Sequence, residues 1–261
     1  STNAVEVPLF KDARSSSGLS ESNQRVVLSA WARSLGLGES DLDHASGSLD
    51  PAHRLEIAAE PGLDGWDPQT ATFLQLFNVS LLYGPQWFLD AARDIPNEVL
   101  ALESSMLKLG YSAQARSHGE EAIFYAEDIP FYDDAQLNVT STGRNARRLA
   151  RACPPDDTAA MSLESLDHYF TISTFEEHAE PIAGAGYDVF SATVGHLAVL
   201  VATAQRANGY GTFMLARVAE ECMFDGLIPQ WVLPLGDEIG ERMAADVGFV
   251  LSGFRTSVTL V

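Results

Sequence analysis

The fold is decided by two adjacent segments, His196-Leu-Ala-Val-Leu-Val201 and Arg206-Ala-Asn-Gly209-Tyr-Gly211. The first is a compact apolar run, which predicts a buried strand covering about 195–201. The second is a glycine-containing turn, and an apolar pattern of helical spacing follows it from about Thr212 to Phe224. Unpaired backbone N–H groups and the positive end of the helix dipole make this turn a candidate anion site.

The sequence after this helix continues the alternation of strands and helices. We expect a strand at Gln230–Leu233, a helix at about Glu238–Asp246 and a final strand over roughly 249–260. In the predicted helix, Ile239, Met243 and Val247 recur every fourth residue, which indicates one apolar face. The order is therefore strand, glycine turn, helix, strand, helix, strand.

The glycine turn has other interpretations, which the residues only partly exclude. A Walker A loop needs Gly-Lys-Ser/Thr, whereas Gly211 is followed by Thr212 with no lysine. A dinucleotide fingerprint needs three glycines early in the chain, and neither condition holds. A structural turn that binds no ligand remains open. Gly209 and Gly211 lack a Cβ, so they would let a diphosphate approach the backbone closely.

Three segments of the C-terminal third resemble the GNAT superfamily of N-acetyltransferases. Arg206-x-x-Gly209-x-Gly211 resembles the acetyl-CoA pyrophosphate loop of that family and directly follows an apolar strand. About 35 residues later, Glu241-Arg-Met-Ala-Ala-Asp-Val-Gly-Phe249 resembles the second motif, a helix that ends in Gly-Phe. Gly226-Leu-Ile-Pro-Gln-Trp231 resembles one bacterial branch. The resemblance covers 193–261 well and 144–192 loosely.

The resemblance implies that acetyl-CoA is the acyl donor. Its pantetheine would lie where the strand 197–201 diverges from the strand 230–233. A backbone N–H of Val199 or Leu200 would then polarise the thioester carbonyl. The cofactor-binding residues expected on this basis are Val199, Leu200, Val201, Arg206, Ala207, Asn208, Gly209, Tyr210, Gly211, Thr212 and Gly240.

The activity that the resemblance implies is direct transfer of an acetyl group to a primary amine, either a small amine or a peptide N-terminus. The catalytic candidates are His196, at the start of the cofactor strand, and Glu177, with its neighbour Glu176, in a polar turn. Histidine titrates near neutral pH and suits a general base. His196 is alternatively a hydrogen-bonded structural histidine. Tyr187 is a stand-in acid or a core residue.

Two positions depart from the family pattern. Asp237 stands where many members have asparagine, and Ala244 stands where many have the tyrosine that protonates the departing thiolate. A second hypothesis is therefore a catalytically silent acyl-CoA-binding module that acts as a sensor or interaction domain. A hydrolase lacks support, because no Gly-x-Ser-x-Gly elbow and no metal-binding histidine pair is present.

The expected fold class is α/β, or α+β, with a mixed, mostly antiparallel, twisted sheet flanked by helices. We expect an N-terminal α/β lobe over 1–135, which is a candidate degenerate copy of the GNAT fold, and the acetyl-CoA-binding domain over 140–261. The other expected helices cover about 22–35, with Ser22 or Asn23 as the N-cap, and about 86–93, 97–108, 144–152 and 156–168. The other expected strands cover about 55–58, 73–83 (as one strand or two), 122–126, 169–175 and 181–190.

The amino-acid composition limits the classes of molecule that this protein is expected to bind. The formal net charge of −20 argues against nucleic acid, whose phosphates require a basic surface. The arginines of the predicted helix 144–152 are candidate phosphate contacts or a solvated helix face. The two cysteines form no metal-ligand spacing and fit a reduced, cytoplasmic setting. No apolar run suggests a membrane span or secretory signal. We expect no metal, and a homodimer is an assembly that the resemblance allows.

Overall fold

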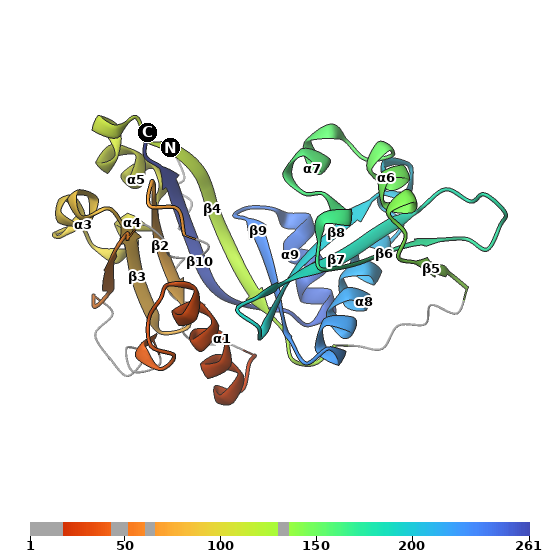
Figure 1. Cartoon of the computed structure of the whole chain (residues 1–261), viewed down its shortest axis with the longest axis horizontal. Coiled ribbons are helices and arrows are strands. Elements are labelled where there is room, and N and C mark those ends of the chain that lie inside the picture. The colour runs from red at the N-terminus through yellow and green to blue at the C-terminus, as the bar shows by residue number, and fades with distance from the viewer. Residues whose placement is uncertain (1–17, 43–51, 61–65, 130–135) are drawn as a thin grey trace, which may run out of the picture. The chain divides into compact units, whose positions relative to one another are not determined.

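The computed structural model describes residues 18–42, 52–60, 66–129 and 136–261 (Figure 1). The helices are α1 (Glu21–Ser34), α3 (Gln86–Ala92), α4 (Asn97–Leu100), α5 (Glu103–Leu109), α6 (Gly143–Arg151), α7 (Pro155–Ala160), α8 (Tyr210–Phe224) and α9 (Glu238–Val247). The strands are β1 (Leu55–Ala58), β2 (Thr70–Leu76), β3 (Val79–Gly84), β4 (Arg116–Tyr125), β5 (Asn138–Thr140), β6 (His168–Ser173), β7 (Ala183–Phe190), β8 (Val194–Val201), β9 (Ile228–Pro234) and β10 (Val250–Thr259). Single 3-10 turns cover Tyr111–Ala113, Leu163–Ser165 and Thr203–Gln205.

The strand pairing is mixed and mostly antiparallel. β1 with β3 and β8 with β9 run parallel, whereas β2 with β3, β2 with β10, β5 with β6, β6 with β7 and β7 with β8 run antiparallel. The predicted fold class, a mixed and mostly antiparallel sheet flanked by helices, is therefore confirmed. Among the residues described, no helix is both long and apolar enough to cross a membrane.

The chain forms two compact units that are interleaved in sequence. The first unit contains 1–124, 233–237 and 250–261, and the second contains 125–232 and 238–249. The predicted boundary between residues 135 and 140 adjoins 130–135, which lie outside the described ranges, and that boundary stays a prediction.

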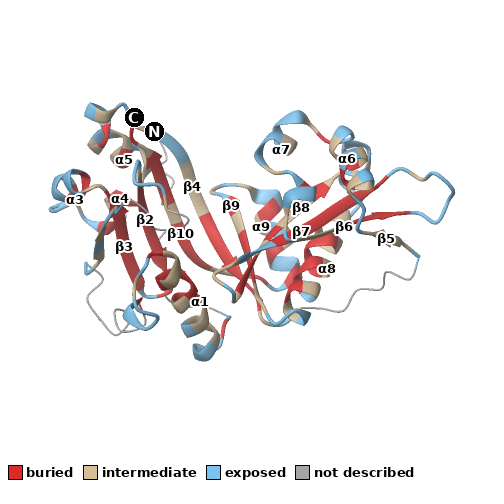
Figure 2. Cartoon of the chain, viewed as in Figure 1, coloured by how far each residue is buried: buried red, intermediate tan, exposed pale blue. Residues whose placement is uncertain are grey.

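The first unit has the strand order β1-β3-β2-β10-β4. One face of this sheet carries an apolar core, in which Phe73 of β2 and Val258 of β10 pack with residues of α3, α4 and α5 such as Phe88 and Met106. Figure 2 shows buried residues along β2, β3 and β10. The opposite face carries Tyr83, whose ring packs against Trp66 with 4.8 Å between the ring centroids.

The second unit has the strand order β9-β8-β7-β6-β5, and helices cover both faces (Figure 1). A Cβ built on Gly195 of β8 would lie 2.3 Å from Cys222 Sγ, so this face packs against α8. A Cβ on Gly184 of β7 would meet Leu149 of α6 at 2.7 Å. Gly184 pairs with Leu200, and the even-numbered residues of β8 therefore face α6.

Most predicted elements are present, but three have different bounds and one has a different N-cap. The helix expected over 97–108 is divided into α4 and α5 by Leu102, which is extended at ψ 128°. The helix expected to reach His168 ends at Ala160, because His168 already belongs to β6 and pairs with Tyr187. The strand expected at 122–126 begins at Arg116. The first helix is capped by Ser20, rather than by the predicted Ser22 or Asn23.

Candidate functional site

The turn before α8 has the backbone geometry of an anion site. Gly209 caps the helix in the left-handed region, with φ 83°, and Ala207 has φ 65°. Across the described ranges, the backbone N–H groups of residues 207–212 have no hydrogen-bond acceptor in the protein. These N–H groups lie at the positive end of a 15-residue helix. Together they can bind an anion such as a diphosphate.

The two glycines leave room above this turn. A Cβ built on Gly209 would meet no atom within 4 Å, so the space beside it is open. A Cβ on Gly211 would lie 3.2 Å from the Met243 thioether of α9 and 3.9 Å from a methyl group of Val201. The turn, the end of β8 and helix α9 are therefore neighbours. Gly240, a predicted cofactor contact, is buried one turn before Met243 on the same helix.

Arg206 is not free to bind an anion without rearrangement. Its Nη2 donates to Oδ2 of Asp157 in α7, and both side chains are partly exposed. A diphosphate at the turn would compete with this carboxylate for the guanidinium, and the Asp157 charge would repel it.

Strands β8 and β9 separate after three paired residues. The parallel register joins Val194 with Ile228 and ends where His196 pairs with Gln230. The rest of β8, Leu197–Val201, is paired on its other side with β7. The divergence expected between 197–201 and 230–233 is therefore present in the backbone.

Hydrogen-bond direction identifies the groups that face the gap. The N–H of Ala202 donates to Ile182 before β7, while the carbonyl of Thr193 accepts from Ile228 before β9. Since the direction alternates along a strand, the even-numbered residues of β8 bond to β7 and the odd-numbered residues point toward β9. The peptide groups of Val199 and Val201 therefore face the gap, whereas that of Leu200 is paired with β7.

His196 belongs to a chain of polar side chains. The hydroxyl of Tyr125 donates to Oε1 of Gln230 at 2.6 Å, and Nε2 of Gln230 lies 3.2 Å from Nδ1 of His196. Tyr125 and Gln230 are both buried, at 0% and 4% exposure, while His196 is half-buried. Neither Gln230, which contacts His196, nor Tyr125, which bonds to Gln230, was predicted from the sequence. The available signal was a glutamine within the otherwise apolar segment of β9.

Glu176 and Glu177 do not lie with His196. Both are exposed in the turn between β6 and β7, and Oε1 of Glu177 lies 3.6 Å from Nε2 of its neighbour His178. That turn precedes Ala183, whereas His196 pairs with Asp188 at the other end of β7. Five residues of strand separate the two positions, which is about 17 Å.

One solved structure has a similar fold over most of this chain. A GNAT-family protein from Novosphingobium aromaticivorans matches 91% of this chain and 99% of its own chain, with a TM-score of 0.50 and 15% sequence identity. The chain has the GNAT fold. At 15% identity, the likeness shows the fold and not the reaction.

Other GNAT structures match over smaller parts. An acetyltransferase from the GNAT family of Colwellia psychrerythraea is 14% identical, with a TM-score of 0.43 over 59% of this chain and 62% of its own. A GCN5-related N-acetyltransferase-like protein from Streptococcus suis is 16% identical, with a TM-score of 0.45 over 73% of this chain and 84% of its own. No family model matches the sequence, and no curated protein does.

Four further residues of the second unit are buried: Tyr187, Cys222, Ala244 and Trp231. Tyr187 is buried on the α8 face and its hydroxyl donates to Asp225, so burial and that hydrogen bond raise its pKa. Burial, followed by the Asp225 charge, raises the pKa of Cys222 to about 12. Ala244 is fully buried in α9. Trp231 is also buried, and its indole Nε1 has no hydrogen-bond partner within the described residues.

Proposed function

We propose that this protein transfers an acetyl group from acetyl-CoA to a primary amine, by direct attack of the amine. One observation carries the proposal: β8 separates from β9 beside the unpaired N-terminus of α8. An unpaired strand edge and a helix N-terminus both carry backbone N–H or C=O groups that require hydrogen-bond partners. An extended amide chain joined to a diphosphate would provide partners for both.

The residues of the turn fit the diphosphate. The N–H groups of 207–212 would donate to it, and Gly209 leaves space for its approach. The odd-numbered peptide groups of β8 would pair with the pantetheine. Of the two predicted oxyanion donors, the N–H of Val199 has the required direction, while Leu200 contributes a side chain packed toward α6. When bound, acetyl-CoA supplies an activated acyl group whose carbon–sulfur bond breaks as the amide forms.

His196 is the proposed proton-transfer group. A base must direct an unprotonated nitrogen toward the amine, so the neutral ring must carry its proton on Nδ1 and leave Nε2 unprotonated. Nδ1–H then needs an acceptor, so the Gln230 amide must turn its oxygen toward His196 and its NH₂ group toward the Tyr125 hydroxyl. Gln230 is therefore a positioning residue.

The opposite orientation of the Gln230 amide gives His196 a different role. With Nε2 of Gln230 donating to Nδ1 of His196, the neutral imidazole keeps its proton on its own Nε2. The ring is then a proton donor, suited to protonating a departing thiolate. A proton donor is required there because Ala244 replaces the family tyrosine.

The alternative function is a silent acyl-CoA-binding module. The observation that favours it is Ala244, which is fully buried and carries no ionisable group. Such a module would bind CoA at the same turn and transfer nothing.

The experiment has two readouts, binding and turnover. We expect acetyl-CoA to raise the melting temperature, since a ligand that binds only the folded state adds RT ln(1 + [L]/Kd) to stability. We then expect free thiol to appear when a panel of small amines and peptides is added. Binding without thiol release across the panel would support the silent module. The absence of any thermal shift at millimolar CoA would overturn both functions.

A further inference from the structure

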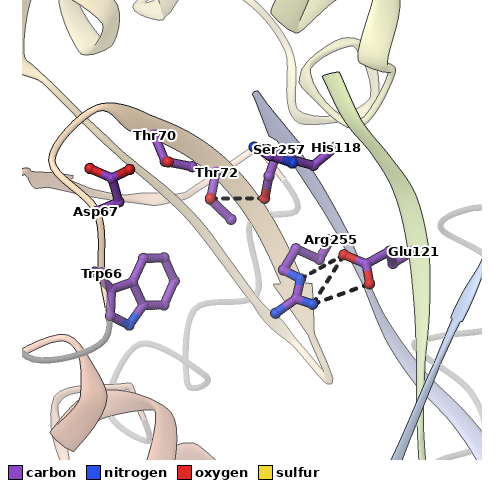
Figure 3. Close-up of a pocket in the computed structure, with 8 residues that line it drawn as sticks. All are labelled: Trp66, Asp67, Thr70, Thr72, His118, Glu121, Arg255 and Ser257. Carbon is purple, nitrogen blue, oxygen red and sulfur yellow. Dashed lines mark hydrogen bonds and ion pairs between the residues drawn. The ribbon is translucent and has the colours of Figure 1, made fainter. Parts of the chain in front are cut away.

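A polar pocket lies within the first unit, on the sheet face opposite α3, α4 and α5. Its volume is about 290 Å³, and residues from β2, β4, β10 and the segment before β2 line it (Figure 3). This volume is at the lower end of the range for ligand sites, roughly 300–1,000 Å³, and suits a small molecule.

The floor of the pocket is polar where a covered sheet face is normally apolar. Thr72 of β2 and Ser257 of β10 are only 3% and 9% exposed, and their hydroxyl oxygens are 2.9 Å apart. The two residues are directly paired across the strands. Hydroxyl groups retain further hydrogen-bonding capacity when they bond to each other, which a polar ligand can use.

Arg255 presents a free donor group. Its Nε and Nη2 contact the Glu121 carboxylate at 3.0–3.2 Å. Across the described ranges its Nη1 bonds to no protein atom. Figure 3 shows that nitrogen directed away from Glu121, on the side of Trp66 and Asp67. The ion pair fixes the guanidinium and leaves two N–H groups for an acceptor.

Asp67 presents the opposite charge. Its Oδ1 accepts the N–H of Gln69 at 2.9 Å, and no cation pairs with it in the described part of the chain. Trp66 lies beside it and packs at a tilted angle of 58° against Tyr83, whose buried hydroxyl has no partner among the described residues. Burial, then the Asp67 charge, raises the pKa of Tyr83. A carboxylate beside an indole ring is a suitable site for an ammonium group.

We propose that this pocket binds a small zwitterion, a free amino acid or similar amino-carboxylate. The carboxylate accepts hydrogen bonds from Arg255 Nη1, and the ammonium group donates to Asp67 beside the ring of Trp66. Because Glu121 already neutralises Arg255, a simple anion would meet the uncompensated carboxylate of Asp67, and a simple cation would leave the Arg255 donors unused.

The test is calorimetric titration of the full-length protein, without CoA, with each of the twenty standard amino acids. Ethylamine and propionate are the single-charge probes. We expect one or more amino acids to bind with a Kd of about 10 mM or tighter, and both probes to bind at least tenfold more weakly. Because CoA is absent, this result is independent of the proposed acetyl transfer.

Two variants test the residues. Asp67→Asn, at an exposed position, should weaken amino-acid binding at least tenfold, and so should the double variant Arg255→Gln/Glu121→Gln, which removes both charges of the pair. Asp90→Asn is the matched control, because Asp90 is an exposed acid of the same unit paired with Arg93. The proposal is overturned if no amino acid binds, if ethylamine or propionate binds equally well, or if Asp67→Asn binds like the wild type.

Discussion

The two candidate sites are built from different parts of the polypeptide. In the second unit, the turn before α8 and the free edge of β8 offer backbone groups, with Gly209 keeping the approach open. In the first unit, the pocket offers side chains, with Arg255 and Asp67 as opposite charges. A backbone site depends on where a Cβ is absent, and a side-chain site depends on which charge is present. Ligand binding at the turn should therefore be lost when an added side chain fills the space. Ligand binding in the pocket should be lost when a charge is removed.

The largest effect is expected for the glycines of the turn. Gly209→Val and Gly211→Val should weaken CoA binding by roughly a thousandfold or more, because three charge-assisted hydrogen bonds worth about 1.5–3 kcal/mol each would be blocked. Gly226→Val is the matched control for Gly209→Val. Gly226 ends the same helix with φ 80° and equally open surroundings, so it suffers the same backbone strain. Calorimetry with CoA compares the three variants. Wild-type affinity in both Gly209→Val and Gly211→Val would show that the diphosphate binds elsewhere.

The next effect concerns His196. We expect His196→Ala to lower turnover by roughly 10–1000-fold near neutral pH, with little change in CoA affinity. His168→Ala is the control, because His168 is another strand histidine of this unit and lies 2.7 Å from Glu221. The pH–rate profile is the decisive measurement. An unchanged acidic limb in His196→Ala would place the base elsewhere, with Glu176 or Glu177 as the next candidates.

Gln230 separates the two possible roles of His196. Gln230→Glu places a carboxylate beside Nδ1, which favours the charged imidazole and the proton on Nδ1. If His196 is the base, the acidic limb of the kcat/KM profile should move to higher pH by about one unit. Gln230→Leu should lower kcat without that shift. An identical profile for both variants would contradict a positioning role for Gln230.

The smallest effect is expected at Asp157. Asp157→Asn releases Arg206 and removes a negative charge beside the turn, so CoA should bind roughly 2–5-fold more tightly, as expected for an exposed ion pair. Asp156→Asn changes the same charge on the same helix without breaking this contact. Calorimetry at low salt compares them. Equal affinities for the two variants would mean that the ion pair does not compete with the ligand.

The backbone site could be predicted from sequence because its geometry is encoded locally. Gly209 and Gly211 lie next to an apolar strand, and that spacing alone places helix α8 and the turn. Val199, Leu200 and Val201 belong to one run, but their hydrogen-bond directions required the register with β7. No sequence pattern connects His196 with Tyr125, because 71 residues separate them.

The side-chain pocket could not be predicted for a similar reason. Its charged residues come from three distant segments, at Asp67, Glu121 and Arg255. Strand β4 was underestimated because its first half, from Arg116 to Glu121, is polar and lacks alternation. A contact with a residue distant in sequence also accompanies the division of the predicted helix over 97–108 into α4 and α5. The N–H of Glu103 at the start of α5 donates to Glu120 of β4 at 2.8 Å, a contact that local propensity does not contain.

The interleaving of the two units has a consequence for synthesis of the protein. β10 lies between β2 and β4 in the first unit, yet the ribosome makes it after every residue of the second unit. The first unit therefore cannot complete its sheet during translation of its own N-terminal segment. The nascent chain must keep β2 and β4 from aggregating through an interval of more than a hundred residues. Folding that depends on contacts so distant in sequence is slow. Until β10 is synthesised, the chain would present unpaired strand edges to the cell's chaperones.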